Sequence, residues 1–174
     1  MTNEAEAGFR ELLEAMKKAG GILNEAGVPW GLGGGLAFWA REGPETEHDV
    51  DFLIRPEDAG RAQQAFAEAG LPTERPPDDL IFDPQDGPVD DDMLGRVEEL
   101  EVYAMRMKVA SLEDVLTQKV LALSEQRPDF SSVLELARSL REQVDWDEAR
   151  DRTRESPFAK AYLTLLDELE IVKT

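Results

Sequence analysis

The sequence predicts an α/β (α+β) protein, in which a small mixed β-sheet flanked by helices is followed by a C-terminal helical segment. Two observations predict this class. In the first half of the 174 residues, short apolar segments typical of strands alternate with segments of helical periodicity. After about residue 110, helical patterns fill the chain. We therefore expect an α/β core over residues 1–110 and a helical subdomain over residues 111–174 that packs on it.

The first half of the chain is expected to follow the order helix, strand, helix, strand, helix. Apolar residues near helical spacing predict the first helix, and Gly27-Val28-Pro29 ends it before a short buried strand. Gly33 to Gly35 break that strand, and Gly70 ends the last helix of this part. The expected elements are a helix over residues 4–23, a strand over 30–32, a helix over 36–41, a strand over 49–54 and a helix over 59–69.

Turn residues and helix caps divide the second half. A short strand is expected over residues 79–83, and an acidic cap at Asp90 begins a short helix. Alternation predicts one strand over residues 100–109, and Ser111 to Asp114 form a slightly altered capping box. The expected helices cover residues 90–97, 111–125, 129–142, 145–154 and 156–170.

Composition narrows the chemistry that the chain could perform. The absence of cysteine removes disulfides, thiolate catalysis and cysteine-ligated zinc, and a single histidine, His48, excludes a zinc site built from histidines of one chain. There is no apolar run of about 18 residues and no signal-peptide pattern, so we expect a cytoplasmic protein without a membrane partner.

The excess of acidic residues limits which partners the protein is expected to bind. Acidic residues outnumber basic ones by 38 to 19, and the formal net charge is −19 at pH 7. Such a charge repels polyanions over long range, which makes nucleic acid an unfavourable partner and favours a small substrate, a cationic one included. The alternative is that the acid excess serves solubility alone. A homodimer or a protein partner stays open.

A glycine turn and two carboxylates carry the chemical hypothesis. Gly34 and Gly35 stand between a strand and a helix, where backbone N–H groups can hold phosphate. Asp49 and Asp51 follow on an apolar strand, and alternation places them on one face, roughly 6.5–7 Å apart at Cα. A divalent cation relieves their mutual repulsion, and hard oxygen ligands favour Mg²⁺ or Mn²⁺. The apolar residues expected to enter the core from this strand are Val50, Phe52 and Ile54.

This arrangement resembles the nucleotidyltransferase superfamily with the DNA polymerase β-like fold, especially its small bacterial members and the antibiotic nucleotidyltransferases. The family pattern is a hydrophobic residue, Gly, then Gly or Ser, a spacer, and Asp, hydrophobic, Asp or Glu, hydrophobic. The positions that match it here are Gly34, Gly35, Asp49, Val50, Asp51 and Phe52. The resemblance extends to about residue 125.

The resemblance implies further site residues and a reaction. It implies a third carboxylate on a neighbouring strand, at Asp79, and a lysine near the nucleotide phosphates, at Lys119. Asp49, Asp51 and Asp79 would then hold one or two Mg²⁺ (or Mn²⁺) ions, and Asp79 could also act as a general base. The implied activity is transfer of an NMP group from an NTP to a hydroxyl of a small molecule, such as an antibiotic, or of a partner macromolecule, as in a toxin–antitoxin pair.

Each of these features has a simpler alternative. Asp49 and Asp51 could form a solvated strand end beside an ordinary glycine turn, and Asp79 could open an edge strand. Lys119 lies among apolar residues and could place its amine in water while its stem packs. The alternative function is a catalytically silent nucleotide-sensing or protein-interaction module with the same fold.

Overall fold

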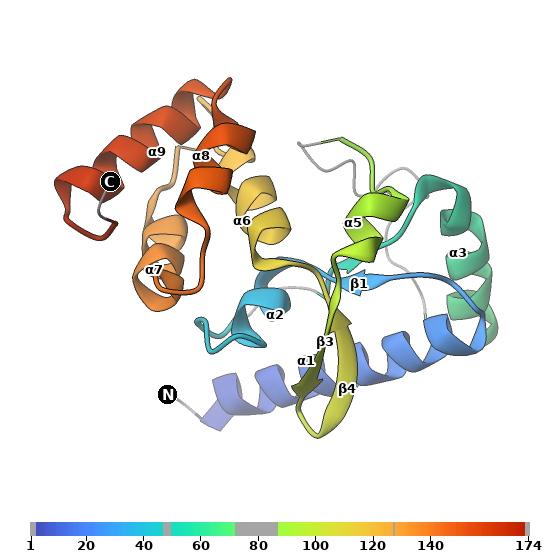
Figure 1. Ribbon diagram of the computed structural model, residues 1–174. Helices are drawn as coiled ribbons and strands as arrows, with labels where there is room; N and C mark the ends of the chain where they lie inside the picture. Colours follow the sequence, from blue (N-terminus) through green and yellow to red (C-terminus); the bar gives the residue numbers. More distant parts are fainter. Residues whose placement is uncertain (1–2, 47–49, 72–86, 127, 173–174) are drawn as a thin grey trace.

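The computed structural model describes residues 3–46, 50–71, 87–126 and 128–172 (Figure 1). Within these ranges it contains eight α-helices and one four-stranded mixed sheet, which confirms the predicted α/β (α+β) class. The described elements are α1 (Asn3–Glu25), β1 (Gly31–Leu32), α2 (Gly34–Trp39), β2 (Phe52–Leu53), the 3₁₀ turn η1 (Pro56–Asp58), α3 (Ala59–Glu68), α5 (Asp91–Gly95), β3 (Glu98–Val102), β4 (Met105–Val109), α6 (Leu112–Leu121), α7 (Ser131–Leu140), α8 (Trp146–Thr153) and α9 (Pro157–Glu168).

The sheet has the strand order β2-β1-β4-β3. β1 is antiparallel to β2 and parallel to β4, while β3 is antiparallel to β4. Because parallel neighbours end at the same edge of a sheet, the helices that follow β1 and β4 begin side by side. These helices are α2 and α6, and the N–H of Ala110 donates to the carbonyl of Leu32 at 2.9 Å where the two strands end. Figure 1 shows α2 lying between the sheet and the C-terminal helices.

The prediction of a single strand over residues 100–109 is wrong, because this segment belongs to a hairpin of β3 and β4. Tyr103 and Ala104 connect the two strands and have positive φ angles of 49° and 57°. A two-residue hairpin turn needs positive φ angles and usually has Asn or Gly at these positions. Because Tyr and Ala stand there instead, the sequence gives no signal of a turn. The ammonium of Lys17 on α1 lies 4.4 Å from the centre of the Tyr103 ring and joins the turn to the first helix.

The helices predicted for the C-terminal segment are present, each somewhat shorter than expected. Ser111, Asp145 and Ser156 cap α6, α8 and α9, and their side-chain oxygens accept hydrogen bonds from backbone N–H groups of the first turns. Among the helices that the structure describes, none is long and apolar enough to cross a bilayer. The strand predicted over residues 79–83 lies outside the described residues, and the division at residue 110 stays a prediction.

Trp30 joins the first helix to the sheet. Its side chain is 2% exposed, and its ring meets Phe52 of β2 edge to face at a centroid distance of 5.2 Å. Its Nε1 donates to the Oδ1 of Asn24 at 3.1 Å, so the ring packs without leaving its polar atom unpaired. A Cβ on Gly20 of α1 would lie 3.2 Å from the indole, which shows how closely the helix approaches.

Asp114 on α6 is a fully buried carboxylate that joins three parts of the chain. It accepts hydrogen bonds from Nε and Nη2 of Arg96, at 3.1 and 2.8 Å, and from Nη2 of Arg152, at 2.8 Å. Arg96 follows α5 and Arg152 lies on α8. Burial by itself would raise the pKa of Asp114, but hydrogen bonds from Arg96, Ser111 and Arg152 outweigh it and hold the pKa below its usual value.

We predict that Asp114→Asn lowers the free energy of unfolding at pH 7 by roughly 3 kcal/mol, since it leaves two arginines facing a neutral side chain. This is the low end of the range for buried pairs, because the Arg96 side chain is 45% exposed. The folded pKa of Asp114 is lowered, so the contribution is complete above the unfolded pKa of about 3.9 and is lost as the pH falls through the folded pKa. Urea unfolding should show the same difference in unfolding free energy between wild type and variant at pH 7 and pH 5. This difference should begin to decrease at pH 4.

Asp151→Asn is the matched control for this substitution. Asp151 pairs with Arg154 at the surface, where the two side chains are 72% and 65% exposed. Its loss should change the free energy of unfolding by less than about 0.5 kcal/mol. Equal effects of the two substitutions would contradict a joining role for Asp114.

Candidate functional site

The glycine turn after β1 is held against the residue that precedes β2. Leu32 pairs with Phe52, and the N–H of Gly33 donates to the carbonyl of Asp51 at 2.9 Å. Gly34 has a φ of +54°, and a Cβ built on it would lie 2.7 Å from the Cγ of Asp51. The Asp51 carboxylate therefore occupies the space that a side chain at position 34 would need, and only glycine fits this turn without displacing it.

Gly35 approaches a second side chain in the same way. A Cβ on Gly35 would lie 2.7 Å from both the Cβ and the Oγ1 of Thr46. The chain after α2 thus folds back so that Thr46 covers the backbone at the start of the helix. α2 itself spans only Gly34–Trp39, so its macrodipole is small, and close backbone approach is the more important property of the turn.

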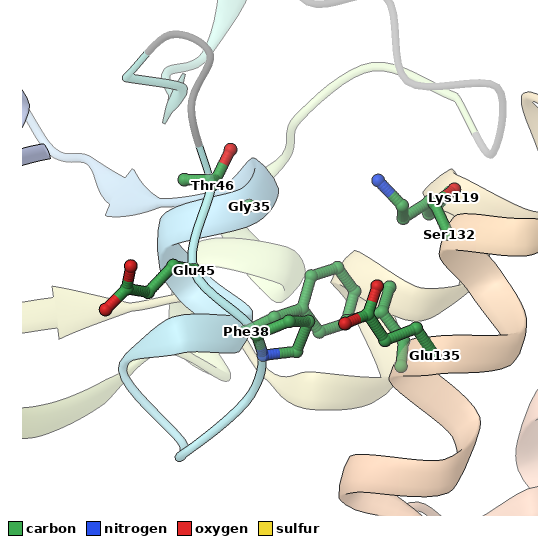
Figure 2. Close-up of a pocket in the computed structure, with 9 residues that line it drawn as sticks. Gly35, Phe38, Glu45, Thr46, Lys119, Ser132 and Glu135 are labelled. Atoms are coloured by element: carbon green, nitrogen blue, oxygen red, sulfur yellow. The ribbon is translucent and has the colours of Figure 1, made fainter. Parts of the chain in front are cut away.

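A cleft of about 280 Å³ opens beside this turn (Figure 2). One wall comes from α2 and the residues that follow it, and the other comes from α6 and α7. The lining residues are Gly35, Phe38, Pro44, Glu45, Thr46, Lys119, Ser132, Glu135 and Leu136. The cleft therefore lies beyond the sheet edge where the parallel strands β1 and β4 end, which is where open α/β sheets usually bind ligands.

Polar groups gather at one end of this cleft. Figure 2 shows the amine of Lys119 directed from α6 towards Thr46 and Gly35, with Ser132 of α7 beside it. Within the described chain, Lys119 forms no hydrogen bond or ion pair, although its charge acts on Asp129. Hydrogen bonds from Ser131 are the main cause of the lowered pKa of Asp129, and the charge of Lys119 adds to them. An ammonium that forms no ion pair can bind an anion locally, while the net charge of −19 repels anions over long range.

The other end of the cleft is apolar except for one carboxylate. Figure 2 shows Glu135 of α7 facing Phe38 of α2, and Pro44 and Leu136 also line the cleft. Phe38 is 1% exposed and belongs to the core. Glu45 borders the cleft too, but Figure 2 shows its carboxylate directed away from it.

The structure brings some of the predicted site residues together. Gly34 and Asp51 are in contact, Gly35 lines the cleft, and Lys119 faces it from the opposite wall. Asp49 and Asp79 lie outside the described residues. Among the residues that are described, no group of three or more Asp, Glu, His or Cys side chains could hold a metal ion. The metal site formed by Asp49, Asp51 and Asp79 therefore stays a prediction, to which the described residues contribute Asp51.

The strand that follows Asp51 is shorter than predicted, and the face expected to be polar is buried. β2 contains only Phe52 and Leu53, so Asp51 directly precedes it. Leu53, which alternation placed on the same face as Asp51, is fully buried. Val50 and Ile54 pack against the core but remain partly exposed, so the expected division into an apolar and a polar face is wrong here. The strand pairing ends at Phe52, and one further hydrogen bond, from the N–H of Gly33 to the carbonyl of Asp51, keeps the Asp51 side chain beside Gly34.

Sequence reasoning missed the cleft residues that come from α7 and from the segment after α2. Thr46, Ser132 and Glu135 line the cleft, yet each is an ordinary polar residue in its own sequence context. Their proximity arises only because α7 lies across the cleft from α2 in the folded chain. No local pattern in the sequence could have identified them.

A scan of protein-family models finds none that matches this chain, and searches among curated proteins and solved structures find no match either. The resemblance to the nucleotidyltransferase superfamily therefore rests on the motif residues themselves.

We predict that Gly34→Ala destabilises the protein more than Gly27→Ala does. Both glycines have positive φ angles, +54° and +64°, so each substitution costs about 1–2 kcal/mol for the left-handed backbone. A Cβ on Gly27 meets nothing within 4 Å, whereas one on Gly34 collides with Asp51 and adds roughly 1–3 kcal/mol of overpacking. Urea unfolding of the two variants measures the difference, and equal losses would show that Asp51 is not held against the turn.

Proposed function

We propose that this protein is a metal-dependent nucleotidyltransferase that transfers an NMP group from an NTP to a hydroxyl of a small molecule or of a partner macromolecule. The observation that carries the proposal is the contact between Gly34 and the Asp51 carboxylate, beside a cleft that Gly35 and Lys119 line. A carboxylate, a close-approaching backbone turn and an unpaired ammonium are the groups that a metal-bound triphosphate needs. The proposal includes a cytoplasmic location.

The charge of the protein agrees with this choice of substrate only if a cation accompanies the nucleotide. A free triphosphate carries several negative charges and would be repelled by a chain of net charge −19. When bound, Mg²⁺ or Mn²⁺ would neutralise phosphate charge and lower the pKa of the attacking hydroxyl. Asp51 would be one of its ligands, together with Asp49, which the sequence pattern predicts, and Asp79, which the resemblance implies.

The chain's own residues would have distinct roles in the transfer. Lys119 would supply a positive charge to phosphate oxygens from one wall of the cleft, and Gly35 with Thr46 over it would line the wall opposite. The close approach of Asp51 to Gly34 would hold this carboxylate beside the same wall. The acceptor oxygen would form a bond to the α-phosphorus as the bond to the β-phosphate oxygen breaks. Pyrophosphate would leave, and Asp79 would receive the proton of the acceptor hydroxyl.

We predict magnesium-dependent pyrophosphate release when the protein is incubated with each NTP and a panel of small hydroxyl-bearing acceptors. Asp49→Asn and Asp51→Asn should each reduce the rate at least about 100-fold, because each removes a metal ligand whose charge acts in the transition state. Asp92→Asn is the matched control, since Asp92 is exposed on α5 and lies outside the cleft.

Two results would argue against this assignment. Pyrophosphate release that survives both Asp49→Asn and Asp51→Asn would contradict the assignment of these residues to the metal site. Nucleotide binding without turnover on any acceptor would instead favour the silent nucleotide-sensing module.

We also predict that Lys119→Ala weakens NTP binding about 10-fold, the loss expected for one charge-assisted contact. Lys160→Ala on the exposed face of α9 should leave the affinity unchanged. Equilibrium binding at low and moderate ionic strength provides the measurement, and the effect of Lys119→Ala should shrink as salt screens the contact. Equal affinities of the two variants would remove Lys119 from the site.

A further inference from the structure

Glu135 places a carboxylate in the apolar end of the cleft. It lies on α7 one turn after Ser132, and residues at this spacing share a helix face, so both side chains border the cleft. Figure 2 shows the Glu135 carboxylate facing Phe38. Within the described residues, this carboxylate has no hydrogen-bond or ion-pair partner; only the backbone carbonyl of Glu135 accepts a bond, from Ser139.

The two ends of the cleft thus differ in the ligand groups that they can bind. Lys119 and the hydroxyls of Thr46 and Ser132 suit an anionic group, while the partly exposed Pro44 supplies apolar surface, backed by the buried Phe38 that the Glu135 carboxylate faces. An occupant that matches both ends is anionic at one end and has a flat body with hydrogen-bond donors at the other. On the proposed function, on which this inference rests, the phosphates lie at Lys119 and the nucleobase lies at Glu135.

The four bases differ in how well they match a carboxylate. An ionised carboxylate accepts hydrogen bonds through two oxygens and donates none. Guanine presents two adjacent donors, N1–H and the N2 amino group, which a carboxylate can accept together. Adenine and cytosine present one amino group beside an acceptor nitrogen, and uracil presents one N–H between two carbonyls. Each of these bases would therefore bring one of its acceptor atoms close to a carboxylate oxygen, which also only accepts.

We infer that Glu135 is a specificity-determining residue that makes the cleft select a guanine nucleotide, with GTP as the nucleotide substrate. The carboxylate would accept from N1–H and N2–H of the base while the ring lies against the apolar lining at Pro44. Glu135 is exposed to solvent in the ligand-free chain, so the expected preference in affinity for guanine is modest, about 10-fold. This value is at the low end of what a bidentate contact to a base contributes.

The test compares the binding of α,β-methylene analogues of GTP, ATP, CTP and UTP, so that no transfer occurs, at fixed Mg²⁺ by calorimetry. The wild-type protein should bind the GTP analogue about 10-fold more tightly than the other three. Glu135→Gln and Glu135→Ala should each weaken the GTP analogue about 10-fold and leave the ATP analogue within about 2-fold. Glu142→Gln is the matched control, because Glu142 follows α7 but lies outside the cleft.

The outcomes separate this inference from the proposed function. Equal affinity for the four analogues, or a guanine preference that survives both substitutions at Glu135, would overturn the inference and leave nucleotide binding intact. Failure of all four analogues to bind would overturn both. Circular dichroism of each variant, with unchanged helix content, ensures that a lost preference does not come from unfolding.

Discussion

The Asp51 carboxylate lies against the backbone of Gly34, and the geometry of the candidate site depends on this contact. The contact forms because the hydrogen bond from Gly33 to Asp51 continues the pairing of β1 with β2 into the turn. Since the left-handed backbone of Gly34 and the nearby carboxylate both exclude a side chain, a single glycine satisfies two independent constraints. The carboxylate and the start of α2 are thereby fixed relative to each other.

The second wall of the cleft depends on the parallel pair of strands. β1 leads into α2 and β4 leads into α6, and both helices begin at one edge of the sheet. Asp114 then fixes α6 through Arg96 and Arg152, one before β3 and one on α8. Lys119 lies farther along the same helix, so its position over the cleft is set by these contacts rather than by any interaction of its own amine.

Electrostatics distinguishes Lys119 from several other cations of the described chain. Arg41, Arg55, Arg96, Arg150 and Arg152 all form ion pairs with carboxylates, as expected in a protein with twice as many acidic as basic residues. Those cations join elements of the fold. Lys119 faces a cavity with its charge uncompensated by such a pair, and Glu135 faces the same cavity as an acid. The cleft thus has a basic side chain at one end and an acidic side chain at the other, so a bound molecule with two different ends would be held in one orientation.

Local chemistry in the sequence determined most of the secondary structure. Helical periodicity and the caps Ser111, Asp145 and Ser156 predicted the C-terminal helices, because a cap acts within one turn of the chain. The turn at Tyr103 and Ala104 was not predicted, because neither residue type favours positive φ angles. Strand pairing and the cation–π contact of Lys17 with Tyr103 support this backbone in the folded protein.

The sequence by itself also determined the glycine turn and the nearby Asp51 carboxylate, since both belong to one short motif. Only the tertiary structure decided that Thr46, Ser132 and Glu135 share a cleft with Gly35 and Lys119. The physical reason is that the cleft forms between α2 and α7, which are far apart in the sequence, and their relative position depends on burial of apolar faces over the whole chain. A polar residue at the border of such a cleft contributes little to that burial, so its position leaves no periodic pattern in the sequence.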